Sequence, residues 1–295
     1  TEIYTLSLHD ALPILELQLD VGTLGGGNHF IELDRADGGG LWLVVHSGSR
    51  HTGLVVSEIY RRLAKAYCAG VPEGTLLDLF LSYASGSAKR DNLAKLTEAL
   101  TAAERTAERR HGRSVPADLS YLEGQLMSFY LQDMELMTRY ADLNRRAIAT
   151  EIVEGMGLTD SVCDRFCTVH NFISRSDGVL RKGAVPAPAG ERFLLPMNMR
   201  DGGLICIGKG NPEWNSSGPH GAGRIMSRGD AKRTLSLSDY TAAMEGIYTT
   251  CVSPETLDEA PDAYKPMDSI LAAIGPTAEV ADRLRPSSKD RKSVV

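Results

Sequence analysis

The pattern of apolar residues changes near residue 160, and this change constrains the fold more than any other feature. Before it, residues 53–68 carry apolar side chains at helical spacing. A longer helix is expected to begin at Ser120, in a capping box with Glu123, and to end at Gly155 or Gly157. After the change, short apolar segments alternate with Gly, Pro and Asn, which predicts short strands. These segments are residues 168–173, 193–195 and 204–207.

The remaining patterns predict one α+β domain with central β-sheets and flanking helices. Leu41–Val45 is a short apolar run between a triple glycine and Ser-Gly-Ser, as expected of a buried strand, and a last helix is expected through Tyr240 to Tyr248. No repeat or linker divides the chain, so residues 16–288 are expected to form the domain. The two ends resemble the translation of a sequencing adapter. We therefore expect 1–15 to be a non-native leader, 289–295 a non-native tail, and the N-terminal part of the domain to be missing.

Composition excludes several classes of protein. The 295 residues include 42% hydrophobic ones, enough for a sizeable core. Lys and Arg number 32 against 38 Asp and Glu, a net charge of −6, which argues against a protein that coats nucleic acid through a broad basic face but permits an enzyme with a small basic cleft. No apolar run approaches the roughly 20 residues that span a bilayer. Five scattered cysteines without a CxxC pair favour a cytoplasmic location.

Four of the seven histidines lie beside small or amide residues: His29 after GGGN, His46 before SGSR, His170 before Asn, and His220 before GAGR. Three of them could hold Mn, Zn, Fe or Ni, and His220 could be a nucleophile beside a flexible backbone and a cation. Each has a structural alternative: GGGNH as a hairpin turn, HSGSR as a strand end with an ion pair, and His170 as a core histidine. Because no HExxH motif occurs, any metal ligands must converge from separate strands.

A series of motifs then resembles the RtcB family of RNA-splicing ligases. They are, in order, GTLGGGNHFIEL, VHSGSR, VHNFI, RKGA, LPMNMRDGGLICIGKGN, SGPHGAGRIMSR and DEAPDAYKPM. The resemblance runs from about Val21 to about Pro286, and HGAGR is its most specific part. It implies an α+β RNA ligase that joins an RNA 3′-phosphate, or a 2′,3′-cyclic phosphate after hydrolysis, to a 5′-hydroxyl with GTP and Mn²⁺, in tRNA splicing or RNA repair.

The resemblance also implies roles for individual residues. His220 matches the histidine that forms a covalent GMP intermediate, and Arg50 and Arg224 match cations near the RNA phosphate and the transferring group. The implied metal ligands are His29, His46 and His170. The implied nucleotide contacts are Asn28, His29, Phe30, Ile31, Glu32, His170, Asn171, Pro196, Met197, Asn198, Met199, Gly203, His220, Gly221, Ala222, Gly223 and Tyr264. Among these, Glu32 would read the guanine edge, Asn171 would contact a phosphate and Tyr264 would pack on the base.

Some positions depart from the family pattern. The family's upstream Asp and metal-bridging Cys have no counterpart here, Gly203 replaces a serine, and Met197, Asn198 and Arg200 differ from the commoner turn. Lys289 and Lys292 are not equated with the family's C-terminal lysine. The expected partners are RNA ends, GTP and an accessory activating protein, without a membrane. Two other functions stay open: a histidine–metal phosphoesterase that uses no nucleotide, and a non-catalytic remnant that binds RNA or a partner.

Overall fold

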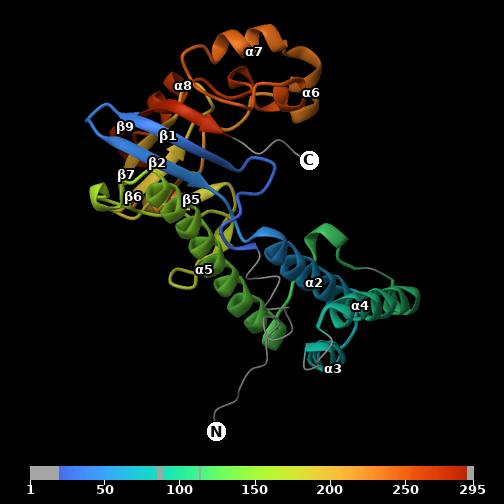
Figure 1. The fold of residues 1–295 in the computed structure, drawn as a ribbon. Coiled ribbons are helices and arrows are strands. Elements are labelled where there is room, and N and C mark those ends of the chain that lie inside the picture. The colour runs from blue at the N-terminus through green and yellow to red at the C-terminus, as the bar shows by residue number, and fades with distance from the viewer. Residues whose placement is uncertain (1–19, 85–88, 113, 291–295) are drawn as a thin grey trace. The chain divides into compact units, whose positions relative to one another are not determined.

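The computed structural model describes residues 20–84, 89–112 and 114–290 (Figure 1). Contacts within the chain divide it into two compact units. We call residues 20–23 and 48–144 the helical unit, and residues 24–47 and 145–290 the sheet unit.

The helical unit contains α2 (Arg50–Cys68), α3 (Glu73–Ala84), α4 (Lys89–His111), the short η2 (Ala117–Leu119) and the first part of α5 (Gly124–Gly155). Helix α2 confirms the helix predicted from the spacing over 53–68. Large apolar side chains from all four α-helices form the core of this unit, and its most deeply buried members are Leu63, Leu76, Phe80, Leu96, Leu100 and Leu126. The charge-rich segment 102–111 belongs to α4, and its charged side chains are exposed or half-buried.

The predicted start of the long helix is wrong. Helix α5 begins at Gly124, and the Ser120 hydroxyl donates to a backbone carbonyl of the preceding turn instead of capping the helix. The first backbone N–H groups of α5 are bound by a carboxylate from another helix: Glu73 Oε1 accepts from the N–H of Gln125 at 2.8 Å and of Leu126 at 3.3 Å. A carboxylate suits the positive end of a helix dipole, so α3 supplies the cap that the local sequence does not.

The sheet unit is built on a five-stranded antiparallel sheet with the order β2-β1-β9-β7-β6. The strands are β1 (Phe30–Ala36), β2 (Leu41–His46), β6 (Arg192–Pro196), β7 (Gly203–Gly208) and β9 (Ala278–Asp290). Strands β2, β6 and β7 confirm the strands predicted over 41–45, 193–195 and 204–207. The predicted strand over 168–173 is reduced to β3 (Phe172–Ile173).

Strand β9 is central to the sheet and had no signal in the sequence. It pairs with β1 on one side and β7 on the other. Proline is disfavoured in a central strand because it cannot donate to a neighbour, yet β9 contains Pro286. The pairing with β1 shifts its register between Leu33 and Asp34, where Asp34 lies opposite Pro286, so the proline falls at an irregularity. Beyond it, β9 continues through Lys289 and Asp290.

Two short ribbons and several short helices complete the sheet unit. Strand β3 pairs with β4 (Leu180–Arg181), and β5 (Ala184–Pro186) pairs with β8 (Ser217–Pro219). The helices are η3 (Thr159–Ser161), η4 (Pro212–Trp214), α6 (Arg228–Thr234), α7 (Leu237–Ala243), η5 (Pro254–Glu259), η6 (Pro261–Ala263) and α8 (Met267–Ala273). The last helix predicted over 240–248 is therefore displaced: α7 begins earlier, after the Ser236 cap, and ends at Ala243.

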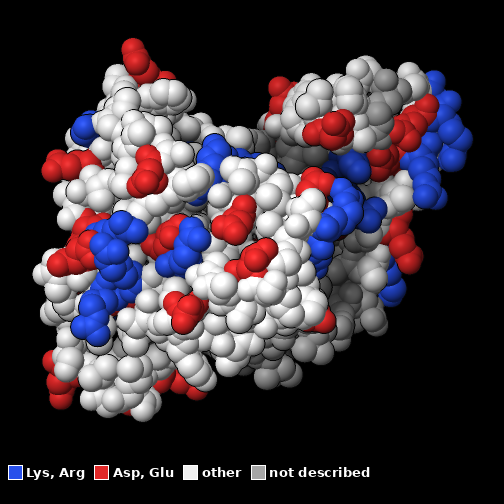
Figure 2. Space-filling view, turned by 90° about the horizontal axis from the view of Figure 1, so that it is seen from above, with Lys and Arg blue, Asp and Glu red and all other residues white. Residues whose placement is uncertain are grey.

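The α+β class is confirmed, with helices and antiparallel sheets in one chain. Within the described ranges, no helix combines the length and the apolar character needed to cross a membrane. On the face drawn in Figure 2, basic and acidic side chains are interspersed, as the near balance of 32 Lys and Arg against 38 Asp and Glu leads one to expect.

Candidate catalytic site

The four histidines singled out in the sequence lie in one row within the sheet unit. The ring centroids of His29 and His46 are 5.6 Å apart, those of His46 and His170 are 5.7 Å apart, and those of His170 and His220 are 5.0 Å apart. Three strands and their neighbouring loops bring the rings together. His29 directly precedes β1, His46 ends β2 opposite Phe30, and His220 directly follows β8.

The row supplies pairs of imidazoles rather than a closed metal cage. Metal–nitrogen bonds of about 2.1 Å would place the ring centres of two imidazoles on one ion roughly 5 Å apart, so neighbouring pairs in the row have a suitable separation. His170 Nδ1 is buried and has no hydrogen-bond partner in the described part of the chain. A nitrogen that binds a metal ion has the same feature when the ion is absent. No group of three or more His, Cys, Asp or Glu side chains among the described residues could hold a metal, however. The donor set therefore fits an ion with few protein ligands.

Burial favours the neutral, ligating form of His170. The pKa of His170 is lowered, first by burial and second by the neighbouring His220 ring. A neutral imidazole is the form that binds metals, so this environment keeps His170 competent at a lower pH than an exposed histidine.

The tautomer of His220 follows from one contact. Its Nδ1 lies 2.8 Å from the carbonyl oxygen of Gly183. A carbonyl can only accept, so Nδ1 carries the proton and Nε2 keeps its lone pair. His220 is exposed, so this second nitrogen can be reached by a substrate. Gly183 has φ +70°, a conformation that favours glycine, which explains the glycine in RKGA.

Asn171 contacts the same glycine. Its side-chain Oδ1 accepts from the Gly183 N–H at 3.0 Å, and its side chain acts to raise the pKa of His170, against the effect of burial. Asn171 holds a left-handed backbone with φ +63°, which asparagine tolerates better than most residues. The structure thus gives Asn171 a contact within the chain, and the phosphate contact implied by the resemblance stays a prediction.

Glu32 lies in a buried charged cluster that the sequence did not reveal. On β1, Phe30, Glu32 and Asp34 share the buried face because side chains alternate along a strand. Lys289 of β9 is opposite Glu32 in the register, and its Nζ lies 2.8 Å from Glu32 Oε2. The same Nζ is 3.3 Å from the carbonyl oxygen of Asn198 and 4.2 Å from the centre of the Phe30 ring. These contacts bring the predicted nucleotide residues Phe30, Glu32 and Asn198 together.

Asp34 is the second carboxyl of this cluster and is held in its neutral form at neutral pH. Its pKa is raised to about 8, first by burial and second by the charge of Glu32, while Lys289 acts in the opposite direction. Neither of its carboxyl oxygens has a hydrogen-bond partner among the described residues. One lysine therefore serves two buried carboxyl groups, and the proton on Asp34 removes the excess negative charge.

Two further predicted nucleotide segments touch one another through the backbone. The Ala222 N–H donates to the Pro196 carbonyl at 3.0 Å, which joins the Gly221–Gly223 loop to the turn that contains Met197, Asn198 and Met199. The turn is closed by the Met197 N–H donating to the Gly202 carbonyl at 2.7 Å, next to Gly203 at the start of β7. A side chain at position 221 would lie 3.3 Å from the Pro196 oxygen, so glycine allows this close approach.

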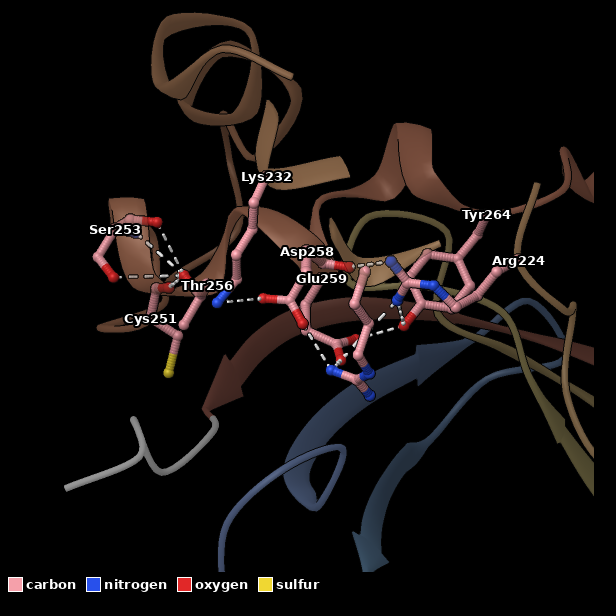
Figure 3. A network of polar contacts seen from close by, with 9 residues as sticks. Arg224, Lys232, Cys251, Ser253, Thr256, Asp258, Glu259 and Tyr264 are labelled. Atoms are coloured by element: carbon pink, nitrogen blue, oxygen red, sulfur yellow. Dashed lines mark hydrogen bonds and ion pairs between the residues drawn. The ribbon is translucent and has the colours of Figure 1, made fainter. Parts of the chain in front are cut away.

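Arg224 and Tyr264 belong to a polar network (Figure 3). The Arg224 guanidinium lies over the Tyr264 ring at 5.0 Å and donates to the Tyr264 hydroxyl at 3.3 Å and to the Asp258 carbonyl at 2.5 Å. The Tyr264 hydroxyl in turn donates to Glu259, and Arg228 pairs with Asp258 and Glu259, each at 2.6 Å. These contacts fix the guanidinium of Arg224, four residues after His220. The role of Arg224 as a cation beside the transferring group stays a prediction.

The remaining predicted site residues lie as follows. Asn28 is exposed in the loop before β1, and Ile31 is half-buried on the face of β1 opposite Glu32. Arg50 belongs to the helical unit, where it begins α2 with φ +57° and its Nε donates to Thr23 Oγ1 at 3.1 Å.

Sequence reasoning missed Lys289, Asp34, Gly183 and Arg181. The RKGA motif was a signal for the last two, since it contains an arginine and a glycine beside the predicted strands. Lys289 had no local signal, because only the pairing of β9 with β1 brings it to Glu32. None of the five cysteines, all of which lie in the described ranges, forms a disulfide.

Comparison with known proteins supports the resemblance. The sequence model of the tRNA-splicing ligase RtcB family matches residues 15–289. RNA-splicing ligase RtcB of Escherichia coli K12 is 29% identical over 283 residues, which cover 90% of this chain and 59% of that relative. RNA-splicing ligase RtcB1 of another Escherichia coli strain is 30% identical with the same coverage. tRNA-splicing ligase RtcB of Methanopyrus kandleri is 27% identical over 312 residues, 90% of this chain and 30% of that relative.

This chain thus spans about three fifths of the length of the two Escherichia coli relatives. The family match covers nearly the whole chain and includes the four histidines of the row. The chain therefore belongs to the tRNA-splicing ligase RtcB family.

Proposed function

We propose that this chain performs the chemistry of an RNA ligase that uses GTP and Mn²⁺. The reaction joins an RNA 3′-phosphate, or a 2′,3′-cyclic phosphate after hydrolysis, to a 5′-hydroxyl. Family membership and the names of the relatives, RNA-splicing and tRNA-splicing ligases, support RNA as the substrate. Because the chain spans about three fifths of its Escherichia coli relatives, the proposal concerns the steps that its own residues can perform.

The contact between His220 and Gly183 carries the proposal. With its proton held on Nδ1 by the Gly183 carbonyl at 2.8 Å, His220 offers Nε2 as the nucleophile. Attack of Nε2 on the α-phosphorus of GTP forms a nitrogen–phosphorus bond, breaks the bond to the β-phosphate and releases pyrophosphate. The ring becomes more positive in this step, and the Gly183 carbonyl stabilises that charge through the Nδ1 proton.

The next two steps regenerate the enzyme. An oxygen of the RNA 3′-phosphate attacks the phosphorus on His220, so the nitrogen–phosphorus bond breaks and GMP passes to the RNA end. The RNA 5′-hydroxyl oxygen then attacks the 3′-phosphorus, GMP leaves, and the hydroxyl proton goes to solvent. Arg224, which lies four residues after His220 and is held by Tyr264 and Asp258, supplies a fixed positive charge beside this step.

Metal ligation would come from the rest of the row. His29, His46 and His170 are the residues that would hold Mn²⁺, and the buried Nδ1 of His170, which has no hydrogen-bond partner in residues 20–84, 89–112 and 114–290, supports this assignment. When bound, Mn²⁺ would offset negative charge on the phosphoryl oxygens. The GTP base would be bound by the cluster around Glu32, where Phe30, Asn198 and Lys289 meet, and the Gly221–Gly223 loop would offer backbone N–H groups to the phosphates.

Covalent labelling tests this function. The full chain is incubated with Mn²⁺ and GTP labelled at the α-phosphate, and acid-labile GMP on the protein is measured. We expect the wild type to be labelled, His220→Ala to lose the label, and His51→Ala, an exposed histidine of the helical unit, to keep it. Joining of RNAs with 3′-phosphate and 5′-hydroxyl ends is then assayed. A label that persists in His220→Ala would refute the nucleophile, and hydrolysis of cyclic phosphate without any GMP label would favour the phosphoesterase.

A further inference from the structure

Arg181 is a buried arginine that no step of the proposed reaction uses. It ends β4, is 3% exposed and directs its guanidinium nitrogens at three residues in two segments of the chain. One nitrogen donates to Asp177 Oδ2 at 2.7 Å, a second donates to Ser217 Oγ at 2.9 Å, and the carbonyl of Asn215 accepts at 3.1 Å. Burying such a group is unfavourable unless it is paired and hydrogen-bonded, and here both conditions are met.

Two of these acceptors lie in the segment that leads into His220. Asn215 and Ser216 both have left-handed backbones, with φ of 49° and 46°. Consecutive non-glycine residues in this region cost free energy, and they persist only where the surrounding structure holds them. Arg181 binds the carbonyl of the first and the side chain of Ser217, the residue after the second. Strand β8 follows at once, and His220 comes directly after it.

The acceptor of the His220 hydrogen bond lies in the segment that starts at Arg181. This acceptor is the carbonyl of Gly183, two residues further along the chain, and it binds His220 Nδ1. Between these points, Ala184 of β5 pairs with Pro219 of β8. Arg181 therefore holds both segments that meet at His220. Its backbone leads directly into Gly183, which carries the acceptor, and its guanidinium binds residues 215 and 217, which lead into His220.

We propose that Arg181 is a positioning residue that sets the tautomer and orientation of His220. It does so by holding the strained Asn215–Ser216 turn against β4, which keeps the Gly183 carbonyl within hydrogen-bond reach of Nδ1. The catalytic consequence rests on the proposed function, whereas the effect on the His220 tautomer does not. A lysine cannot replace Arg181, because a single ammonium on a flexible stem does not reproduce three donors in a fixed planar fork.

The tautomer of His220 is measured by long-range ¹H–¹⁵N NMR of the full chain with labelled histidine. The His220 signals are those missing from His220→Ala. In the wild type we expect the Nδ1–H form to dominate. In Arg181→Lys we expect a shift toward a mixture of tautomers and a rate of GMP labelling lower by about 10–100-fold, the loss typical of a small misplacement of a reacting group. Arg285→Lys is the matched control, since Arg285 also pairs with a carboxylate, Asp37, but at the surface.

The variants separate the possible outcomes. An Arg181→Lys protein with wild-type His220 signals and labelling would overturn the proposal. If Arg181→Lys does not fold, Ser217→Ala is the test, because it removes one of the three contacts of Arg181. A smaller shift of the His220 signals in the same direction supports the proposal, and unchanged His220 signals overturn it. If the wild type forms no GMP adduct, the proposed function fails, but the tautomer measurement still tests the positioning role.

Discussion

Lys289 Nζ lies 2.8 Å from Glu32 Oε2, and both side chains are 2% exposed. The pair joins the neighbouring strands β1 and β9, and its two residues lie opposite one another in the register although 257 residues separate them in the chain. A buried ion pair of this kind contributes little net stability compared with an apolar pair, but removal of one partner leaves a buried charge without compensation. The free energy of unfolding should therefore depend on Lys289.

Replacement of Lys289 tests that dependence. We expect Lys289→Met to lower the free energy of unfolding at pH 7 by about 3–5 kcal/mol, because Glu32 loses its cation in a buried position. Urea denaturation followed by circular dichroism measures the change. Arg285→Met is the control, since Arg285 and Asp37 are about half exposed and an exposed pair contributes at most about 1 kcal/mol. Equal losses in the two variants would contradict the buried ion pair.

Asp34 predicts how stability depends on pH. Its pKa in the folded chain is raised to about 8, chiefly by burial, whereas an unfolded aspartate has a pKa of about 3.9. Between these values the folded chain binds a proton that the unfolded chain does not. The free energy of unfolding must therefore fall as pH rises through this window, by up to about 1.4 kcal/mol per pH unit.

We expect Asp34→Asn to flatten this slope, so that the variant gains most over the wild type near pH 8 and least near pH 4. Urea denaturation at several pH values provides the measurement. Asp37→Asn is the control: the pKa of Asp37 is lowered by its hydrogen bonds with Arg285, so its effect has the opposite sign and lies at lower pH. Parallel pH profiles for the wild type and Asp34→Asn would show that Asp34 is ionised in the folded chain.

The carboxylate of Glu73 caps α5 from outside, and its removal should be measurable. We expect Glu73→Gln to lower stability by about 1 kcal/mol, the usual cost of a lost helix cap. Gly124→Ala should be at least as harmful, because Gly124 has φ +56° and an added Cβ would lie 2.5 Å from Glu73 Oε1. Gly155→Ala is the control within the same helix, since nothing lies within 4 Å of a Cβ there. Thermal melts compare the three variants.

The start of α5 illustrates why the sequence predicted some features and missed others. Helix α2, strand β2 and the four histidines were predictable because their signals are local: apolar spacing, a bounded apolar run and glycine-rich neighbours. Ser120 and Glu123 fit a local capping pattern equally well, but Glu73, about fifty residues earlier, binds the helix N-terminus instead. A cap supplied through tertiary contacts leaves no trace in the helix's own sequence.

The central strand and the buried charges were missed for the same reason. Pro286 and the charged residues of β9 interrupt the alternation that reveals a strand, and the strand is stabilised by neighbours on both sides. Lys289 matters only because the register places it opposite Glu32. The histidine row could be predicted as a set from its motifs, whereas its order and the contact of His220 with Gly183 required the fold.

The histidine row finally predicts how the chain should bind Mn²⁺. Its donors are imidazoles without an anionic ligand, and no group of three candidate ligands is formed among the described residues, so we expect weak binding. Binding should weaken further as the pH falls, because protonated imidazoles cannot ligate, and burial, which lowers the pKa of His170, lowers the pH at which this residue stops ligating.

Single substitutions identify the ligands. Loss of residues that only support metal ligands typically weakens metal binding 10–100-fold, so His46→Ala, which removes a proposed direct ligand, should weaken Mn²⁺ binding at least about tenfold. His220→Ala should leave Mn²⁺ binding nearly unchanged, and His51→Ala is the matched control in the helical unit. Titration of the full chain with Mn²⁺, followed by electron paramagnetic resonance of the free ion, measures the affinity without any turnover. Equal affinities for His46→Ala and His51→Ala would exclude His46 as a ligand, and two tight sites per chain would mean that donors outside the row take part.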